Sequence, residues 1–223
     1  MLYTYALRRS PLKVLPGASQ SHAHYFGGEL ALARLDSSRF ARLLTLDLRD
    51  PLLSFLRFPP ATVTLPLLMD FAEGYISYSL GEDASSIELH SPEVSSAESL
   101  LDEQLPQHPA HLERIPYEQY RAAAFRSAVL DESYLSDEDR SALHQLGEEF
   151  TQVGGELLRG SSYSPYCSNP ACMGCGTQVT ASLASVTQSP APGIWLGFLP
   201  NDPSVEFSLC QSCHSISGTV VVD

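Results

Sequence analysis

The residues best suited to chemistry are five cysteines in the C-terminal part of the chain. They are Cys167, Cys172, Cys175, Cys210 and Cys213. Four of them form two Cys-x-x-Cys units, and each unit can direct two thiolates at one point. Together the units supply the four soft ligands that tetrahedral zinc prefers, and four thiolates leave no open coordination position. The spacing therefore predicts one structural Zn²⁺ bound by Cys172, Cys175, Cys210 and Cys213.

Other assignments of these thiols stay open. The first three cysteines and the distant Cys210 also match the spacing of plant-type [2Fe–2S] proteins, although that pattern leaves Cys213 without a role. The string from Cys210 to His214 matches a c-type haem attachment motif, but such attachment requires export and we identify no export signal. Cys167 or His214 could also replace one of the four zinc ligands. A thiol pair without metal is the remaining interpretation.

Composition limits the class of protein and its partners. The chain has 223 residues with 26 acidic and 13 basic side chains, a net charge of -13. This charge repels phosphate backbones, so we expect no nucleic-acid partner. The longest apolar runs are too short to cross a bilayer, so we expect no membrane partner. An odd number of cysteines without an export signal favours a reducing compartment, and we predict a cytoplasmic protein.

A repeated sequence motif suggests how the chain is organised. Residues 25–30 and 152–157 both contain Gly-Gly-Glu-Leu, and each copy is followed by three runs with β-like patterns. The runs are 43–48, 65–71 and 75–80 after the first copy, and 179–186, 193–199 and 205–210 after the second. A diglycine permits positive φ and close backbone approach where a chain enters a sheet. We predict a tandem duplication of an antiparallel β unit.

The segment between the two units has a different composition. Residues 81–111 are rich in Ser, Glu and Pro and predict a long surface excursion or linker. Two helices are expected next. Pro116 can open the first, whose apolar stripe is Tyr117, Tyr120, Ala124, Phe125 and Val129. Ser136 can cap the second, whose buried face is Ala142, Leu143, Leu146 and Phe150.

The predicted fold class is α+β and rich in β structure. Two pseudo-repeated antiparallel β units are bridged by helices, with the zinc site in the second unit. We assign residues 1–90 to the first β repeat, 91–150 to the linker and helical bridge, and 151–223 to the second β repeat with its zinc knuckles.

Other residues give weaker indications of chemistry. His22 and His24 flank Ala23, a spacing that presents both imidazoles on one face of a strand. Asp47 and Asp70 lie within apolar runs and could form a carboxylate pair. The usual enzyme strings, such as a nucleophile elbow or an HExxH helix, are absent from the sequence. We therefore favour a protein that is not an enzyme, with a hydrolase using these four groups between the repeats as an alternative.

The layout resembles a known family. Two β-rich repeats entered through Phe26-Gly27-Gly28 and Val153-Gly154-Gly155, with a helical bridge, look like the YwqG-like family of uncharacterised bacterial cytoplasmic proteins. The diglycine followed by two Cys-x-x-Cys knuckles is similar to the C-terminal domain of the programmed-cell-death-two proteins of eukaryotes. The sequence departs from the YwqG-like pattern in having Glu29-Leu30-Ala31-Leu32 in place of a proline and a tryptophan. Because that family has no settled activity, the resemblance implies a fold more than a function.

These observations lead to a functional expectation. We predict a non-enzymatic structural-zinc protein that acts through contacts with an unidentified protein partner. A [2Fe–2S] electron-transfer protein is the second hypothesis, because of the spacing of the first three cysteines.

Overall fold

The structure is a computed structural model of the whole chain. It describes residues 11–19, 21–30, 35, 39–81, 86–90, 104–128, 132–146, 150–155, 171–177, 180–187 and 204–221.

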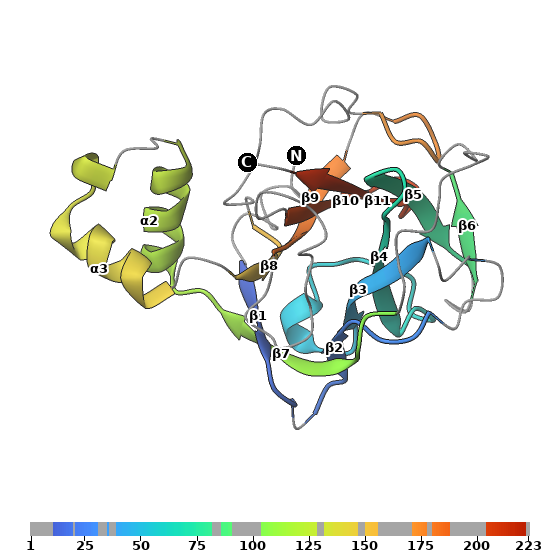
Figure 1. Cartoon of the computed structure of the whole chain (residues 1–223), viewed down its shortest axis with the longest axis horizontal. Helices are drawn as coiled ribbons and strands as arrows, with labels where there is room; N and C mark the ends of the chain where they lie inside the picture. The colour runs from blue at the N-terminus through green and yellow to red at the C-terminus, as the bar shows by residue number, and fades with distance from the viewer. Residues whose placement is uncertain are drawn as a thin grey trace.

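Eleven strands form a single curled sheet in which every pair is antiparallel (Figure 1). Their order across the sheet is β4-β3-β2-β7-β1-β8-β9-β10-β11-β5-β6. The strands are β1 (Leu12–Pro16), β2 (His24–Phe26), β3 (Phe40–Asp47), β4 (Thr64–Asp70), β5 (Tyr75–Leu80), β6 (Ile87–Leu89), β7 (His108–Arg114), β8 (Thr151–Val153), β9 (Thr180–Val186), β10 (Ser204–Cys210) and β11 (Ile216–Val221). The β-rich character predicted from the sequence is therefore confirmed.

Five of the six predicted β runs correspond to strands. They are β3, β4, β5, β9 and β10, with ends that differ from the predicted ones by no more than three residues. The sixth run, 193–199, lies outside the described residues. These strands match because their inward residues are apolar and fully buried, as Leu44, Leu46 and Leu67 are.

Part of the segment predicted as a surface linker is instead strand. β6 and β7 both lie within or extend from residues 81–111, and β7 pairs with β2 on one side and with β1 on the other. Its inward residues Ala110 and Leu112 are buried. This segment was misread because β7 offers only two inward apolar side chains, and Pro109 weakens the strand signal.

The two diglycines occupy equivalent positions in the sheet. Gly27, Gly28, Gly154 and Gly155 all have positive φ, between 61° and 100°. The N–H of Gly27 donates to the Leu43 carbonyl at 3.0 Å, and the N–H of Gly154 donates to the Leu183 carbonyl at 2.8 Å. Leu43 in β3 and Leu183 in β9 are each the extra residue at a register shift. Each diglycine thus ties a short strand to a β-bulge in the next strand.

A buried tyrosine joins two strands whose backbones do not pair. The Tyr78 hydroxyl of β5 donates to the Pro66 carbonyl of β4 at 2.6 Å and accepts from the Leu68 N–H at 3.2 Å. Tyr78 is fully buried, and burial raises the pKa of its hydroxyl. The side chain therefore satisfies backbone groups on the edge of β4 and helps the sheet to curl over its core.

Two helices stand to one side of the sheet (Figure 1). They are α2 (Tyr117–Ala128) and α3 (Asp137–Leu146). Two short 3₁₀ turns are also present in the described part of the chain: η1 (Pro51–Leu53) lies between β3 and β4, and η2 (Glu132–Tyr134) lies between the two helices in the chain. The predicted cap of α3 is confirmed, because the Ser136 hydroxyl accepts from the Asp139 N–H at 3.1 Å. Among the described residues, neither helix has the length and apolar character that crossing a bilayer requires.

The helices bury a small core of their own. Ile115, Tyr120, Ala123 and Leu146 form it, with Leu143 and Phe150 packed against them. The buried face predicted for α3 is thus largely confirmed. In α2, however, Tyr117 is 71% exposed. The predicted stripe is therefore wrong at Tyr117 and confirmed at Tyr120, which lies in this core with Ala123. The side chains of its other members, Ala124, Phe125 and Val129, lie outside the described residues.

The only lysine of the chain links this helical pair to the sheet. Lys13 of β1 donates through Nζ to the carbonyl of Leu146, the last residue of α3, at 2.7 Å. Nζ also lies 5.4 Å from the ring centroid of Phe150. A cation at the C-terminal end of a helix is stabilised by the unpaired carbonyl groups there. The contact therefore fixes α3 against β1.

Candidate metal centre

Two turns bring four cysteines together at one end of the sheet. The first, knuckle 1 (residues 172–176), lies just before β9. The second, knuckle 2 (residues 210–214), connects β10 to β11. Cys210 pairs with Thr180 in the β9–β10 ladder, so neighbouring strands set the two turns side by side. The expectation that a metal would join the ends of two strands agrees with this placement.

The four sulfur atoms have the spacing that one four-coordinate ion needs. All four lie within 4.8 Å of one another. Cys172 Sγ is 3.5 Å from Cys213 Sγ, and Cys175 Sγ is 3.6 Å from Cys210 Sγ. A tetrahedron with metal–sulfur bonds of about 2.3 Å has edges of about 3.8 Å. None of the four cysteines is in a disulfide. The donor set therefore fits a single soft or borderline metal ion.

The two knuckles have the same backbone geometry. In knuckle 1, Cys172 N–H donates to the Thr177 carbonyl at 2.7 Å and Gly176 N–H donates to the Cys172 carbonyl at 2.7 Å. In knuckle 2, the matching bonds run from Cys210 to Ser215 at 2.8 Å and from His214 to Cys210 at 2.9 Å. Each turn is thus closed by two backbone bonds that leave both sulfurs free to point at the shared centre.

The fifth residue of each knuckle adopts a left-handed conformation. Gly176 has φ of 72° and His214 has φ of 60°, the latter being the only positive φ of a non-glycine residue in the described part of the chain. Glycine takes this conformation readily, whereas histidine takes it at a cost. His214 Nε2 lies 3.0 Å from the Arg57 carbonyl, and its ring contacts Phe58 with centroids 5.5 Å apart. These contacts hold the knuckle against residues 57–58, so the imidazole is engaged outside the sulfur cluster.

Two hydroxyl groups lie close to the sulfur atoms of the cysteines. Thr177 Oγ1 lies 3.2 Å from Cys175 Sγ and 3.4 Å from Cys210 Sγ, and Ser215 Oγ lies 3.0 Å from Cys213 Sγ. A hydroxyl that donates to a thiolate stabilises its charge and orients it. Both hydroxyls occupy the position five residues after the first cysteine of a knuckle. Neither hydroxyl was predicted from the sequence, although that repeated position was a usable signal.

Hydrogen bonds and burial set the thiol pKa values in opposite directions. Burial raises the pKa of Cys213 to about 12. Burial also acts on Cys210, but hydrogen bonds from Thr177 and from the N–H groups of Cys213 and Ser212 outweigh it and lower the pKa of Cys210 to about 6. A hydrogen bond with Thr177 lowers the pKa of Cys175. Because metal ligands are thiolates, an incoming ion must displace the Cys213 proton, and acid that protonates Cys210 opposes binding.

The packing around the centre is tight at Gly174. A methyl group on Gly174 would collide with Ser215 Oγ, the same atom that contacts Cys213 Sγ. Cys167, the alternative ligand predicted from the sequence, lies outside the described residues. Within the described part of the chain, the metal-binding atoms that converge are the sulfurs of the four predicted cysteines.

His24 has a structural environment rather than one suited to a catalytic base. Its Nδ1 accepts from the Asp47 N–H at 3.0 Å, and its Nε2 lies 3.0 Å from Asp50 Oδ2. Because a backbone N–H can only donate, Nε2 carries the proton and donates to Asp50. Burial lowers the pKa of His24. Both ring nitrogens are thus engaged in holding the end of β3 to β2, and no sequence pattern indicated Asp50 as the partner.

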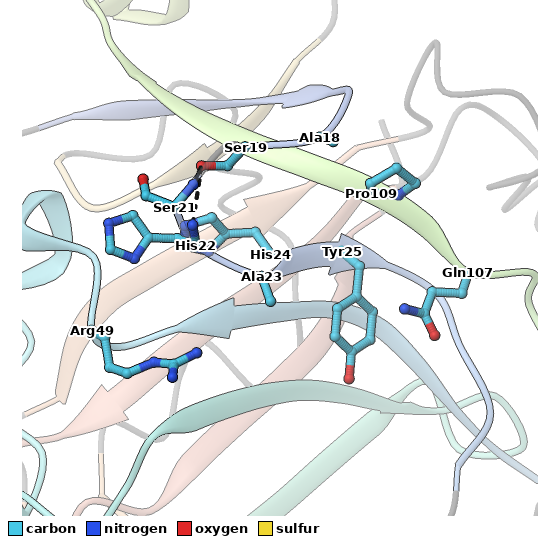
Figure 2. A pocket seen from close by; sticks show the side chains of 10 residues that line it. All are labelled: Ala18, Ser19, Ser21, His22, Ala23, His24, Tyr25, Arg49, Gln107 and Pro109. Carbon is cyan, nitrogen blue, oxygen red and sulfur yellow. Dashed lines mark hydrogen bonds between the residues drawn. The ribbon is translucent and has the colours of Figure 1, made fainter.

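His22 lines a shallow cavity of about 490 Å³ beside β2 (Figure 2). Its ring centroid lies 6.1 Å from that of His24, and its backbone N–H donates to Ser19 Oγ at 3.2 Å. The other polar groups of the cavity are spread along it, with Arg49 and Gln107 at opposite ends (Figure 2). The polar side chains therefore do not converge on a common point.

The two candidate carboxylates lie far apart. In the β3–β4 ladder, Asp47 pairs with Thr64 whereas Asp70 pairs with Phe40, at the opposite end. Seven strand residues separate the two ends by about 20 Å. Each carboxylate has its own arginine, Asp47 with Arg49 and Asp70 with Arg39. The bidentate bond from Arg49 lowers the pKa of Asp47. The four groups proposed for a hydrolase site therefore do not form one site.

Comparison of the chain with protein-family models, with curated proteins and with solved structures finds no match in any of the three. The resemblance to the YwqG-like family and to the programmed-cell-death-two proteins therefore stays a prediction. The geometry of the cysteine centre is the observation on which a function can be argued.

Proposed function

We propose that this protein holds one structural zinc ion in its cysteine centre and acts through contacts with other proteins rather than by catalysis. The observation that carries the metal assignment is the convergence of four sulfur atoms from two equivalent knuckles within 4.8 Å. Four thiolates close the coordination shell of zinc, so the ion would stabilise the fold and leave no position for a substrate. A cytoplasmic location and the absence of a nucleic-acid partner belong to the same proposal.

The spacing favours zinc over a [2Fe–2S] cluster. A two-iron cluster divides its four cysteines between two irons, so sulfurs on different irons lie further apart than sulfurs on one iron, whereas all four sulfurs here lie within 4.8 Å of one another. The iron–sulfur spacing read from the sequence also left Cys213 without a role, whereas Cys213 is one of the gathered four.

Elemental analysis of the purified protein tests the metal assignment. We expect one zinc per chain, less than a tenth of an equivalent of iron, and a colourless sample after anaerobic purification. The same measurement on Cys167→Ser should give the same zinc content, because Cys167 is not in the proposed ligand set. Visible absorbance together with two irons per chain would replace zinc by the iron–sulfur alternative.

The proposed contact surface lies on the helical pair. Tyr134 of η2 is 71% exposed, and the Asp137 side chain at the start of α3 is 96% exposed. Glu138 adds a second acidic group to the same exposed turn. We call Tyr134, Asp137 and Glu138 the acidic aromatic patch. An exposed aromatic ring beside carboxylates suits a partner that presents arginine or lysine side chains.

Cross-linking from two sites on the helices tests this surface. A photo-reactive phenylalanine analogue placed at Tyr134 should capture a protein partner in cells, and capture should fall at least fivefold when Asp137 and Glu138 become Asn and Gln. The same analogue at Tyr117, which is equally exposed at 71%, serves as the matched control and should capture little. Equal capture from both positions, or capture unaffected by the charge changes, would contradict the patch as the contact surface.

We also propose that the two halves arose by duplication, as the repeated Gly-Gly-Glu-Leu predicts, but with β10 equivalent to β4 rather than to β5, which is the match that the order of the predicted runs implied. The supporting observations are the equivalent diglycines, the two bulges and the turns that follow β4 and β10. Gly74 N–H donates to the Asp70 carbonyl at 3.0 Å, as His214 N–H donates to the Cys210 carbonyl at 2.9 Å. In the first half the carboxylate of Asp70 pairs with Arg39, so an ion pair stands where the second half has a metal ligand.

A further inference from the structure

The cysteine centre pairs its sulfurs across the two knuckles in a specific way. Cys172 contacts Cys213, and Cys175 contacts Cys210, at 3.5 Å and 3.6 Å. Cys172 and Cys210 are buried, with 4% and 2% of their surface exposed, whereas Cys175 is exposed and Cys213 is partly exposed. Each contact therefore joins one accessible sulfur to one buried sulfur. Accessible thiols beside a second thiol are those that oxidise reversibly to disulfides.

We propose that four-electron oxidation, two electrons for each S–S bond, converts this centre into two disulfides, Cys172–Cys213 and Cys175–Cys210, which replace the metal as the link between the knuckles. The inference rests on the proposed function only in assuming that a metal joins the knuckles in the reduced protein. Its consequence is a fold that keeps the ends of β9 and β10 joined under both reducing and oxidising conditions.

Hydrogen peroxide is an oxidant of the required class. The Cys175 thiolate attacks one peroxide oxygen, the O–O bond breaks, and Cys175 becomes a sulfenic acid as hydroxide leaves. The Cys210 thiolate then attacks the Cys175 sulfur and displaces a second hydroxide, which forms the S–S bond. Two electrons pass from the sulfurs to one peroxide. A second peroxide oxidises Cys213 and Cys172 in the same way, and the metal departs as a hydrated ion.

The knuckle backbones can stay in place during this change. A disulfide bond of about 2.05 Å requires each sulfur pair, now at 3.5 Å and 3.6 Å, to approach by about 1.5 Å, and we expect rotation of the cysteine side chains to supply this movement. The backbone bonds that close the turns, from Cys172 to Thr177 and from Cys210 to Ser215, do not involve sulfur. Disulfides within a knuckle, between Cys172 and Cys175 or between Cys210 and Cys213, would instead leave the two turns unlinked.

Disulfide mapping decides between these pairings. The Cys167→Ser variant, which removes the fifth thiol, is treated with hydrogen peroxide in the presence of EDTA, and its free thiols are then blocked. Peptide mass spectrometry without reduction should recover the two cross-knuckle pairs in at least fivefold excess over the pairs within knuckles. Cys175–Cys210 should form first, because Cys175 is the exposed sulfur.

The stability of the oxidised protein supplies a second measurement. After oxidation in EDTA, its thermal midpoint should stay within about 5 °C of that of the reduced metal-bound protein, whereas reduced protein in EDTA should melt at least 10 °C lower. Pairs within knuckles, or unfolding on oxidation, would overturn the inference. Elemental analysis of the reduced sample is read separately, so a protein without metal contradicts the proposed function and leaves the disulfide map to judge the pairing.

Discussion

Replacing Cys172 by serine is expected to abolish metal binding and to lower the free energy of unfolding by more than about 4 kcal/mol. Cys172 is 4% exposed and contacts Cys213 Sγ at 3.5 Å. A serine oxygen is a harder and poorer ligand for zinc than a thiolate, and the three remaining thiols, of which Cys210 is buried, would be left without their ion. Because the proposed ion would join knuckle 1, before β9, to the β10–β11 turn, its loss should loosen both. Elemental analysis and urea unfolding measure the two effects.

The matched control for this variant lies inside knuckle 2. Ser212 is exposed and lies between Cys210 and Cys213, so Ser212→Ala changes the same turn without removing a sulfur. We expect it to keep one metal per chain and to change the free energy of unfolding by less than about 0.5 kcal/mol. Full metal content in Cys172→Ser would show that this cysteine is not a ligand, whatever its stability.

Local patterns were sufficient to predict five of the eleven described strands and the gathering of four cysteines. β3, β4 and β10 contain enough buried apolar residues to be recognised as strands from the sequence. A Cys-x-x-Cys unit places its two sulfurs together within one turn. The predicted convergence of Cys172 and Cys210 needed one further step, that the turns flank neighbouring strands. The repeated motif in the sequence supported that step, because it assigned residues 179–186 and 205–210 to the same β unit.

Features that depend on distant partners could not be predicted in this way. β7 is a central strand although it contains Pro109 and only two inward apolar residues, because β1 and β2 supply its hydrogen bonds. The role of His24 depends on the Asp47 N–H, 23 residues away, and on Asp50. No local sequence pattern indicates that a buried imidazole will accept a hydrogen bond from Asp47 and donate one to Asp50. Proximity of His22 and His24 in the sequence therefore suggested chemistry where the fold has a structural contact.

The proposed duplication would relate the two halves through one change of chemistry. The turn after β4 and the turn after β10 share their closing backbone bond, but Asp70 of the first meets a guanidinium, whereas Cys210 of the second meets other thiols. With the proposed metal ion bound, both arrangements would place a positive charge, from an arginine or from the ion, against the end of the strand. Under this proposal a strand end is fixed by an ion pair in one half and by thiolates in the other.

Replacing Gly27 by alanine is expected to lower the free energy of unfolding by about 2–5 kcal/mol. Gly27 has φ of 61°, and a Cβ atom there would collide with the Pro106 carbonyl oxygen and lie 3.1 Å from that of Leu105. The left-handed conformation costs an alanine about 1–2 kcal/mol, and displacing backbone adds about 1–3 kcal/mol. The N–H of Gly27 also bonds to the bulge at Leu43, so the residue cannot move without disturbing β3. Urea unfolding followed by circular dichroism measures the loss.

Gly176→Ala separates the two contributions, because it shares the conformation but not the crowding. Gly176 has φ of 72°, and a Cβ atom there would meet nothing within 4 Å. Its substitution should therefore cost only the conformational part, about 1–2 kcal/mol, and should leave the metal content unchanged. If Gly27→Ala and Gly176→Ala destabilise the protein equally, the approach of the residue 105–106 backbone to the first diglycine is not what requires glycine there. A larger loss at Gly27 would instead show that glycine is required there because the residue 105–106 backbone approaches it so closely.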